Sequence, residues 1–379
     1  MGSEKGMSAP ARLRALLRGG GVHPLPCCHD ALSAKMIGQA GFDAAFISGF
    51  TTSAAKIAQP DCGLITYTEM IDAARSMVEA TTIPLVVDGD NGYGNAMNVK
   101  RTIKGYSMAG LAGILLEDQK VPKSCGHVQN KEVVGRAEAV ARVQAAVQAR
   151  DAATSNDDDR IVLIARTDAK QAVSFAEALW RVEAFCDVGA DMVFVDALES
   201  EEEMREVCAL AAKHGRPVLA NMLESGKGPI LGLDELKDVG FALAVYPLAL
   251  LGVCMAAMRS ALEGLKQGKV PEVSRDRASS VFAVAARVAC VHRAHMCLRA
   301  SSCAGQRQRE SKCAEKKKNK EKGSDLTCVR VLPFHSSGRL RLQVHQGRAW
   351  IRPLLRGTRK NRGRRPSVRS EGGMMRGLG

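Results

Sequence analysis

Residues 113–127 read Gly-Ile-Leu-Leu-Glu-Asp-Gln-Lys-Val-Pro-Lys-Ser-Cys-Gly-His, and the pattern of this stretch decides the predicted fold. The short apolar run 114–116 ends in two acids, the first of them Glu117, which is typical of a buried strand bounded by charge. A loop follows that carries Cys125 close to His127. Carboxylates at the end of a strand suit a metal ion, and a thiol on the loop beyond suits proton transfer or nucleophilic attack. We therefore expect much of the chemistry here.

Seven further apolar runs share this character and predict strands. With the first, the eight runs span 23–27, 44–48, 84–87, 114–116, 161–165, 192–195, 217–220 and 243–246. Between them lie Ala-rich segments such as 137–150 and 175–188, whose apolar residues recur three and four positions apart and predict helices. Strands that alternate with helices predict a parallel sheet, and eight such units in about 250 residues match a (β/α)₈ TIM-type barrel.

A doubly wound open sheet is the alternative fold. It would require a Gly-rich phosphate loop after an early strand. The run Gly19-Gly20-Gly21 precedes the first predicted strand instead, so we interpret it as a linker and favour the barrel.

Charge divides the chain into unlike parts. Residues 1–275 carry 29 Lys and Arg against 34 Asp and Glu, whereas residues 276–379 carry 25 against 6. We expect an N-terminal segment over 1–22, a catalytic barrel over 23–270 that runs into a helical extension, and a basic, largely disordered tail over 271–379, because such a tail buries too little apolar surface to offset its ordering entropy.

Three interpretations of the tail remain open. Zinc binding would use Cys and His residues whose spacing fits no standard finger: Cys290, His292, His295, Cys297 and Cys303. Nucleic-acid binding would use the Lys and Arg runs. The interpretation we favour is that the tail is translated from misassigned coding sequence, so we expect no nucleic-acid partner for the barrel itself.

The N-terminus lacks the apolar core of a secretory signal, and no stretch approaches about 18 apolar residues, so we expect no membrane span. The 12 cysteines show no regular spacing, which favours reduced thiols in the cytoplasm. Import into an organelle is the alternative, with only Arg12, Arg14 and Arg18 in its favour.

Polar side chains follow the predicted strands. In chain order the strand ends carry Asp30, Ser48 with Gly49, Asp88 with Asp90, Glu117 with Asp118, Arg166 with Asp168, Asp196, Asn221 and Pro247. Active sites of such barrels lie at the carboxyl ends of the strands. These side chains therefore predict an oxygen-rich pocket for a hard divalent cation, with an arginine to hold an anionic substrate.

The metal prediction depends on three acids. Asp88 and Asp90 are two positions apart and share one face of a strand. With Glu117 from the next strand they form an oxygen cluster suited to Mg²⁺, an ion that usually takes one or two direct carboxylates and keeps several waters. The alternative is that the run Asp-Gly-Asp-Asn-Gly only forms a turn that caps a helix.

Two further side chains have competing interpretations. Arg166 ends a buried strand and needs an anionic partner, which is either Asp168 or a substrate carboxylate held in bidentate fashion. Cys125 lies among Lys120, Lys123 and His127, and this cationic setting favours the thiolate. The alternative for Cys125 is an ordinary free cysteine.

Residues 12–270 resemble the isocitrate lyase and phosphoenolpyruvate mutase superfamily, and most of all its short members: methylisocitrate lyase, dimethylmalate lyase, oxaloacetate hydrolase and petal death protein. The resemblance is carried by Asp30-Ala-Leu-Ser-Ala, Phe46-Ile-Ser-Gly, Gln59-Pro-Asp-Cys-Gly, Val87-Asp-Gly-Asp-Asn-Gly-Tyr-Gly, Leu116-Glu-Asp-Gln, Lys123-Ser-Cys-Gly-His, Ala165-Arg-Thr-Asp-Ala and Ala220-Asn-Met.

The resemblance implies an enzyme that makes or breaks a bond beside the enolate of a small α-keto acid with the help of Mg²⁺, or of Mn²⁺ in its place. Carried over by position, Asp88 is the direct metal ligand, and Asp61, Asp90 and Glu117 bind through water. Superfamily members pack a C-terminal helix on a neighbouring subunit, which implies a homodimer or homotetramer if the tail permits.

The substrate site implied by the resemblance has two parts. A carboxylate of the substrate is held by Ser48, Gly49 and Arg166. The rest of the pocket is formed by Phe50, Asp196, Asn221 and Pro247. Cys125, on a mobile loop with Lys123 and His127, is the general acid that protonates the departing enolate.

The pattern Lys-x-Cys-Gly-His around Cys125 favours a carbon–carbon lyase or hydrolase over a phosphomutase within the superfamily. We expect a small carboxylate substrate such as 2-methylisocitrate, a 2-alkylmalate or oxaloacetate. Two departures bear on that choice. Asp196 stands where many relatives have a glutamate, and Phe46 stands where lyases often have a tyrosine.

Overall fold

The computed structural model describes residues 6–123, 131–224, 226 and 228–270. Its eight strands are β1 (His23–Cys28), β2 (Ala45–Ile47), β3 (Leu85–Asp88), β4 (Gly113–Glu117), β5 (Val162–Thr167), β6 (Met192–Val195), β7 (Leu219–Asn221) and β8 (Leu243–Tyr246). Each overlaps one predicted apolar run. The predicted disorder of 271–379 and the proposed tail functions lie outside the described residues.

The strands form one parallel sheet in the order β6-β5-β4-β3-β2-β1-β8-β7. Its two ends, β6 and β7, meet through a parallel bridge between Val193 and Val218, where the Val193 N–H donates to the carbonyl of Pro217 at 3.2 Å. The sheet therefore curves into a nearly closed barrel, and the predicted (β/α)₈ fold is confirmed.

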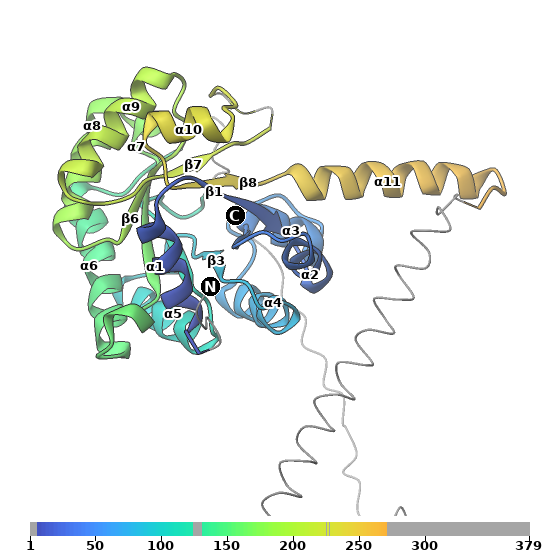
Figure 1. The fold of residues 1–379 in the computed structure, drawn as a ribbon, viewed down its shortest axis with the longest axis horizontal. Coiled ribbons are helices and arrows are strands. Elements are labelled where there is room, and N and C mark those ends of the chain that lie inside the picture. Colours follow the sequence, from blue (N-terminus) through green and yellow to red (C-terminus); the bar gives the residue numbers. More distant parts are fainter. Residues whose placement is uncertain (1–5, 124–130, 225, 227, 271–379) are drawn as a thin grey trace, which may run out of the picture. The chain divides into compact units, whose positions relative to one another are not determined.

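Helices connect the strands and surround them (Figure 1). They are α1 (Ala9–Gly19), α2 (Ala31–Gln39), α3 (Gly49–Ile57), α4 (Tyr67–Ala80), α5 (Ala96–Met108), α6 (Arg136–Ala153), α7 (Ala169–Ala172), α8 (Phe175–Asp187), α9 (Glu201–Lys213), α10 (Leu233–Val239) and α11 (Ala249–Lys266), with a short 3₁₀ helix, η1 (Asp157–Asp159). Several begin at a side-chain cap. At α4, the Thr66 side chain accepts the backbone N–H of Glu69, and the Glu69 side chain accepts the backbone N–H of Thr66.

Two apolar cores follow from the alternation of side chains along the strands. In β4, Leu115 points into the barrel, whereas Ile114 and Leu116 face the surrounding helices. The inner core also receives Leu13 from α1, which is fully buried. Helix α1 lies in the N-terminal segment 1–22, which was predicted to be separate from the barrel. It thus supplies part of the barrel's interior packing.

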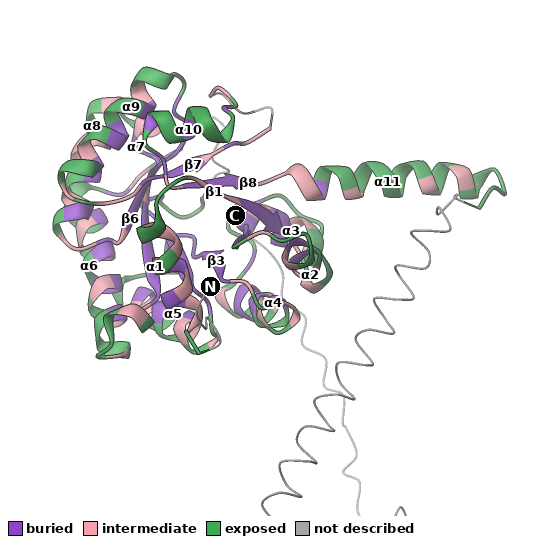
Figure 2. Ribbon diagram, viewed as in Figure 1, coloured by how far each residue is buried: buried purple, intermediate pink, exposed green. Residues whose placement is uncertain are grey.

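The last described helix, α11, differs from the others in burial. Only Leu251 of its 18 residues is buried, and Figure 2 shows exposed and half-buried residues along the rest of it. Its exposed large apolar residues are Val253, Met255, Met258, Leu262 and Leu265. Among the described residues, no helix is both long enough and apolar enough to cross a membrane.

Candidate active site

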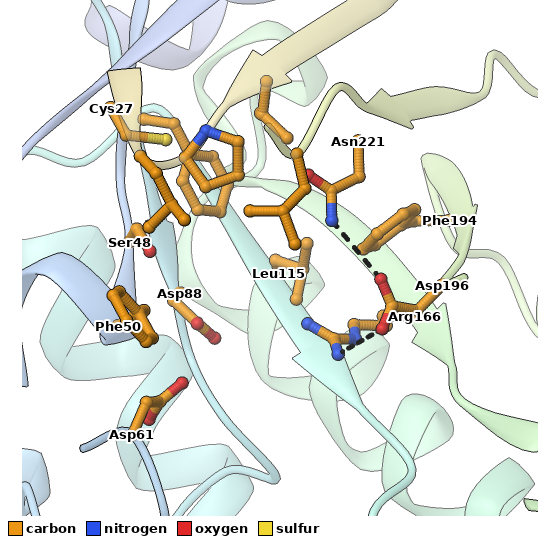
Figure 3. A pocket seen from close by; sticks show the side chains of 15 residues that line it. Cys27, Ser48, Phe50, Asp61, Asp88, Leu115, Arg166, Phe194, Asp196 and Asn221 are labelled. Carbon is orange, nitrogen blue, oxygen red and sulfur yellow. Dashed lines mark hydrogen bonds and ion pairs between the residues drawn. The ribbon is translucent and has the colours of Figure 1, made fainter. Parts of the chain in front are cut away.

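One pocket lies at the carboxyl ends of the barrel strands, where the sequence predicts the site. Two kinds of wall face each other across it (Figure 3). Ser48, Asp61 and Asp88 form one side, while Arg166 and Asp196 form the other. Phe50, Asn221 and Pro247 line it as predicted, and Phe46 also borders it. The barrel therefore brings acids and an arginine to opposite sides of one cavity.

The acidic wall contains two buried carboxylates that border the pocket, Asp61 and Asp88. Two further buried carboxylates, Asp90 and Glu117, belong to the same group of acids but do not border the pocket. Asp88 is fixed by two backbone donors, since its Oδ1 accepts the N–H of Asp90 at 3.0 Å and its Oδ2 accepts the N–H of Gly49 at 3.2 Å. Asp90 lies in a turn with φ +47°. Asp88 and Asp90 are thus joined through the backbone, and the run does form a turn, but the cap of α5 is Asn95 rather than a residue of this run.

Lys123 supplies the positive charge of this wall. Its ammonium lies 2.8 Å from Asp61 Oδ1 and also pairs with Asp90. Burial opposes the charged form, but the carboxylates of Asp90 and Asp88 raise the pKa of Lys123 well above its ordinary value. Lys123 is therefore a buried ammonium ion inside the acidic cluster.

One lysine does not balance these acids. Burial raises the pKa of Glu117 to about 8 and that of Asp90 to about 7, although Arg166 and Lys123 act in the opposite direction. Gln119 donates to one oxygen of Glu117 at 3.1 Å, but its other oxygen, Oε1, is buried without a hydrogen-bond partner among the described residues. Burial therefore favours the protonated forms of Glu117 and Asp90 in the ion-free protein.

These features fit a divalent ion bound largely through water. Within the described part of the chain, no three Asp, Glu, His or Cys side chains are placed to ligate one ion together. Mg²⁺ does not require such a cage, because it commonly takes one or two carboxylates and keeps its waters. Asp88 can serve as the direct ligand, and bound waters would supply the donor that Glu117 Oε1 lacks.

The opposite wall is organised by Arg166. Its Nε and Nη2 donate to the two oxygens of Asp168 at 3.0 and 2.8 Å, and Nη2 also reaches Asp196 at 3.1 Å. The guanidinium carbon lies 5.4 Å from the centre of the Phe194 ring. The internal ion pair with Asp168, one of the two interpretations left open by the sequence, is therefore present.

Lys131 joins the same group of charges. Its ammonium pairs with Asp168 and lies 2.8 Å from Asp196 Oδ2, and all three side chains are at most 1% exposed. Asn221 donates to the other oxygen of Asp196 at 3.4 Å. Lys131 was not predicted from the sequence, because a single lysine before a helix carries no recognisable pattern.

Of the two residues predicted to hold the substrate's carboxylate, Ser48 borders the pocket and Gly49 does not. Ser48 is buried, lines the pocket and precedes α3, and its side chain makes no capping bond. The N–H of Gly49, however, donates to Asp88. A Cβ at Gly49 would lie 2.8 Å from Asp88 Oδ2, so the close approach of this backbone to the carboxylate requires glycine.

Several other residues differ from the prediction or escape it. Asp30 is not a pocket residue: its side chain accepts from the Ser33 N–H and caps α2. Asp118 likewise binds Thr167 and Arg181 behind the pocket. Cys27 lines the pocket although nothing in its sequence context distinguishes it, and burial holds its pKa well above that of an ordinary thiol. The predicted catalytic residues Cys125 and His127 lie outside the described residues.

Comparison with known proteins places the chain in a family. A sequence model of the family described as phosphoenolpyruvate phosphomutase matches residues 13–266. The 2,3-dimethylmalate lyase of Eubacterium barkeri is 41% identical over 260 residues, which cover 69% of this chain and 87% of that protein.

Two solved structures extend the comparison. Oxaloacetate acetylhydrolase in complex with the inhibitor 3,3-difluorooxalacetate has a TM-score of 0.68 and 33% identity, and covers 74% of this chain and 95% of its own. A phosphonopyruvate hydrolase in complex with oxalate and Mg²⁺ has a TM-score of 0.63 and 26% identity, with 75% and 98% covered. The family match spans the whole barrel, and the chain belongs to the phosphoenolpyruvate mutase/isocitrate lyase superfamily.

Proposed function

We propose that this protein is a Mg²⁺-dependent carbon–carbon lyase or hydrolase whose substrate is a small α-hydroxy or α-keto di- or tricarboxylate, such as 2-methylisocitrate, a 2-alkylmalate or oxaloacetate. One observation carries the proposal: the buried carboxylates of Asp61 and Asp88 lie across one pocket from the guanidinium of Arg166 (Figure 3). A ligand with a keto or hydroxyl oxygen at one end and a carboxylate at the other matches both walls. The dimethylmalate lyase and the oxaloacetate acetylhydrolase act on, or bind, compounds of this class.

We assign the metal to Asp88 as direct ligand, with Asp61, Asp90 and Glu117 binding through water. When bound, Mg²⁺, or Mn²⁺ in its place, would stabilise the negative charge that develops on an enolate oxygen as the bond breaks. The Mg²⁺ and oxalate held by the phosphonopyruvate hydrolase support this choice of ion.

The chain's own residues would bind and orient the substrate. Ser48 precedes α3 with an uncommitted hydroxyl, and the N-terminus of a helix favours a negative group. Arg166 is held rigidly by Asp168, so its remaining guanidinium edge is presented to the pocket in one orientation. Phe50, Asn221 and Pro247 would fit the substrate's side groups, and Asp196, shorter than glutamate, would leave room for an alkyl branch.

Cleavage leaves a carbanion or enolate that must gain a proton. We assign this step to Cys125 as general acid, with Lys123 and His127 of the same motif adjusting the charge around the thiol. The thiol would give its proton to the carbon that loses its bond, and the substrate hydroxyl would lose one as the new carbonyl forms, so the lyase reaction is balanced in protons.

A substrate screen tests the proposal. The protein is incubated with Mg²⁺ and each of the three substrates, and release of keto acid or loss of oxaloacetate is followed. We expect turnover that EDTA abolishes and that Cys125→Ser reduces to near background while Mg²⁺ binding persists. No turnover with any substrate, with or without EDTA, would refute the assignment, and an active Cys125→Ser protein would remove the thiol from it.

A phosphomutase is the second candidate, because the matching family is named for that activity. Phosphorus NMR distinguishes the two. A new carbon–phosphorus signal after incubation with a phosphoenolpyruvate-like substrate would favour the mutase.

We further propose that the protein assembles as a homo-oligomer. The support is α11, an 18-residue helix with one buried residue and several exposed leucines and methionines. A second copy of the chain would cover this apolar surface, which is unusual for a helix left in water.

A further inference from the structure

Arg166 is surrounded by more negative charge than it can balance. Two carboxylates, Asp168 and Asp196, pair with its guanidinium, and Glu117 Oε2 lies 3.5 Å from Nε. Even without Glu117, one guanidinium against two aspartate carboxylates leaves one net negative charge. Such a group would repel an incoming carboxylate rather than bind it.

Lys131 supplies the missing charge. Its ammonium pairs with both Asp168 and Asp196, the same two carboxylates that hold Arg166. Burial opposes the charged form of Lys131, but Asp168 and Asp196 raise its pKa above the ordinary value, so it remains an ammonium ion. Among the described residues, the group then holds two cations and two aspartates and is neutral before substrate arrives.

The lysine is also fixed in place by its backbone. Glu132 accepts the N–H of Lys120 at 2.9 Å, and Val133 pairs with Gln119 in an antiparallel bridge. The chain around Lys131 is thereby tied to the residues that follow β4. Lys131 does not border the pocket, so it acts on a substrate only through the aspartates and the arginine.

The guanidinium keeps one edge available. Arg166 uses Nε and Nη2 for its hydrogen bonds to Asp168 and Asp196, and no hydrogen bond or ion pair joins Nη1 to any residue that the structure describes. Figure 3 shows the Arg166 side chain at the pocket wall, on the side facing Asp88. A carboxylate can therefore meet a free N–H edge of an arginine whose other bonds are already satisfied.

We propose that Lys131 is a positioning residue that neutralises Asp168 and Asp196 and so leaves Arg166 able to bind a substrate carboxylate. The proposal rests on the proposed function only for the role of Arg166 as the carboxylate holder. A lysine with a purely structural role would also stabilise the fold, but its loss would not change carboxylate affinity through charge.

Oxalate binding in the presence of Mg²⁺, measured by titration calorimetry on the full chain, tests the proposal. We expect Lys131→Met to weaken oxalate binding by about tenfold or more, because it leaves an unbalanced buried aspartate beside the arginine. Lys131→Arg keeps the charge and should bind within about threefold of the native protein, by the same charge argument. In turnover, the loss should appear in KM more than in kcat.

The decisive variant is Lys131→Met combined with Asp168→Asn, which removes one charge of each sign. Neutrality is restored, so oxalate affinity should recover most of what Lys131→Met loses. This variant also buries no unpaired charge, so it replaces Lys131→Met if the latter does not fold. A folded double variant that binds oxalate as weakly as Lys131→Met alone, or more than about tenfold below the native protein, would overturn the proposal.

The remaining outcomes separate this inference from the proposed function. If no substrate is turned over but oxalate binding depends on Lys131 as described, the reaction assignment fails and the inference stands. If substrate is turned over and a folded Lys131→Met protein binds oxalate like the native one, the inference alone fails. A native protein that binds no oxalate would overturn the carboxylate site and the inference together.

Discussion

The raised pKa of Glu117 predicts how the stability of the protein depends on pH. Its folded pKa of about 8 lies above its ordinary value of 4.5, so the folded protein holds this proton more tightly than the unfolded chain does. The free energy of unfolding of the ion-free protein should therefore fall as pH rises from about 4.5 through about 8, by on the order of 1–3 kcal/mol. Urea denaturation in EDTA at about pH 5, 7 and 9 measures it.

Glu117→Gln is the matched control, because the amide keeps the shape and cannot ionise. Its free energy of unfolding should vary less across this range than that of the native protein. Equal pH dependence in the two proteins would show that Glu117 does not hold the extra proton.

Substitution of Gly49 tests whether its close contact with Asp88 holds the proposed metal ligand in place. Gly49→Ala places a Cβ 2.8 Å from Asp88 Oδ2, so the carboxylate or the start of α3 must shift. We expect Mn²⁺ binding, followed by electron paramagnetic resonance, to weaken by about tenfold or more, because ion sites tolerate displacements of only a few tenths of an ångström.

Gly252→Ala in α11 is the control for this change, since a Cβ there meets no atom within 4 Å. It should leave Mn²⁺ affinity unchanged and favour the helix slightly. If both variants bind Mn²⁺ like the native protein, Asp88 is not held as its hydrogen bonds indicate.

The prediction that the protein forms a homo-oligomer concerns helix α11. Leu262 is 62% exposed on this helix, so a charge there should disfavour contact with a second copy while leaving the barrel folded. We expect Leu262→Glu to lower the molar mass measured by light scattering after size-exclusion chromatography. Leu32→Glu in α2 is the control, because Leu32 is similarly exposed at 58% but lies on a helix whose other face packs on the barrel. An unchanged mass for Leu262→Glu would argue against assembly through α11.

The chain as a whole joins an acidic barrel to a strongly basic tail. The family match ends at residue 266, the last residue of α11. We therefore expect a chain cut after Arg275 to retain the turnover and Mg²⁺ dependence of the full chain. The same cut should remove any salt-sensitive binding to nucleic acid, because the excess of Lys and Arg lies beyond it. Nucleic-acid binding that survives the cut would place it on the barrel.

The fold was predictable because each strand is a short apolar run ending in a polar residue, and such runs are local. The same rule located Asp88, Glu117 and Arg166, since the carboxyl ends of parallel strands meet at one edge. It misplaced Asp30, whose position after a strand resembles that of Asp88 but whose side chain caps a helix. Lys131 and Cys27 escaped prediction because their importance comes from contacts between distant segments, and composition and periodicity carry no record of those.

Lys123 has a consequence for how the site is filled. In the ion-free protein its ammonium already satisfies part of the demand of Asp61 and Asp90. Binding of Mg²⁺ at the proposed site would then displace the Lys123 ammonium from these carboxylates, so one cation would replace another. The measured affinity would be the ion's intrinsic preference reduced by the free energy needed to release the ammonium from its carboxylates. The protein would thereby tolerate periods without its metal, because a tethered substitute keeps four clustered acids from repelling one another.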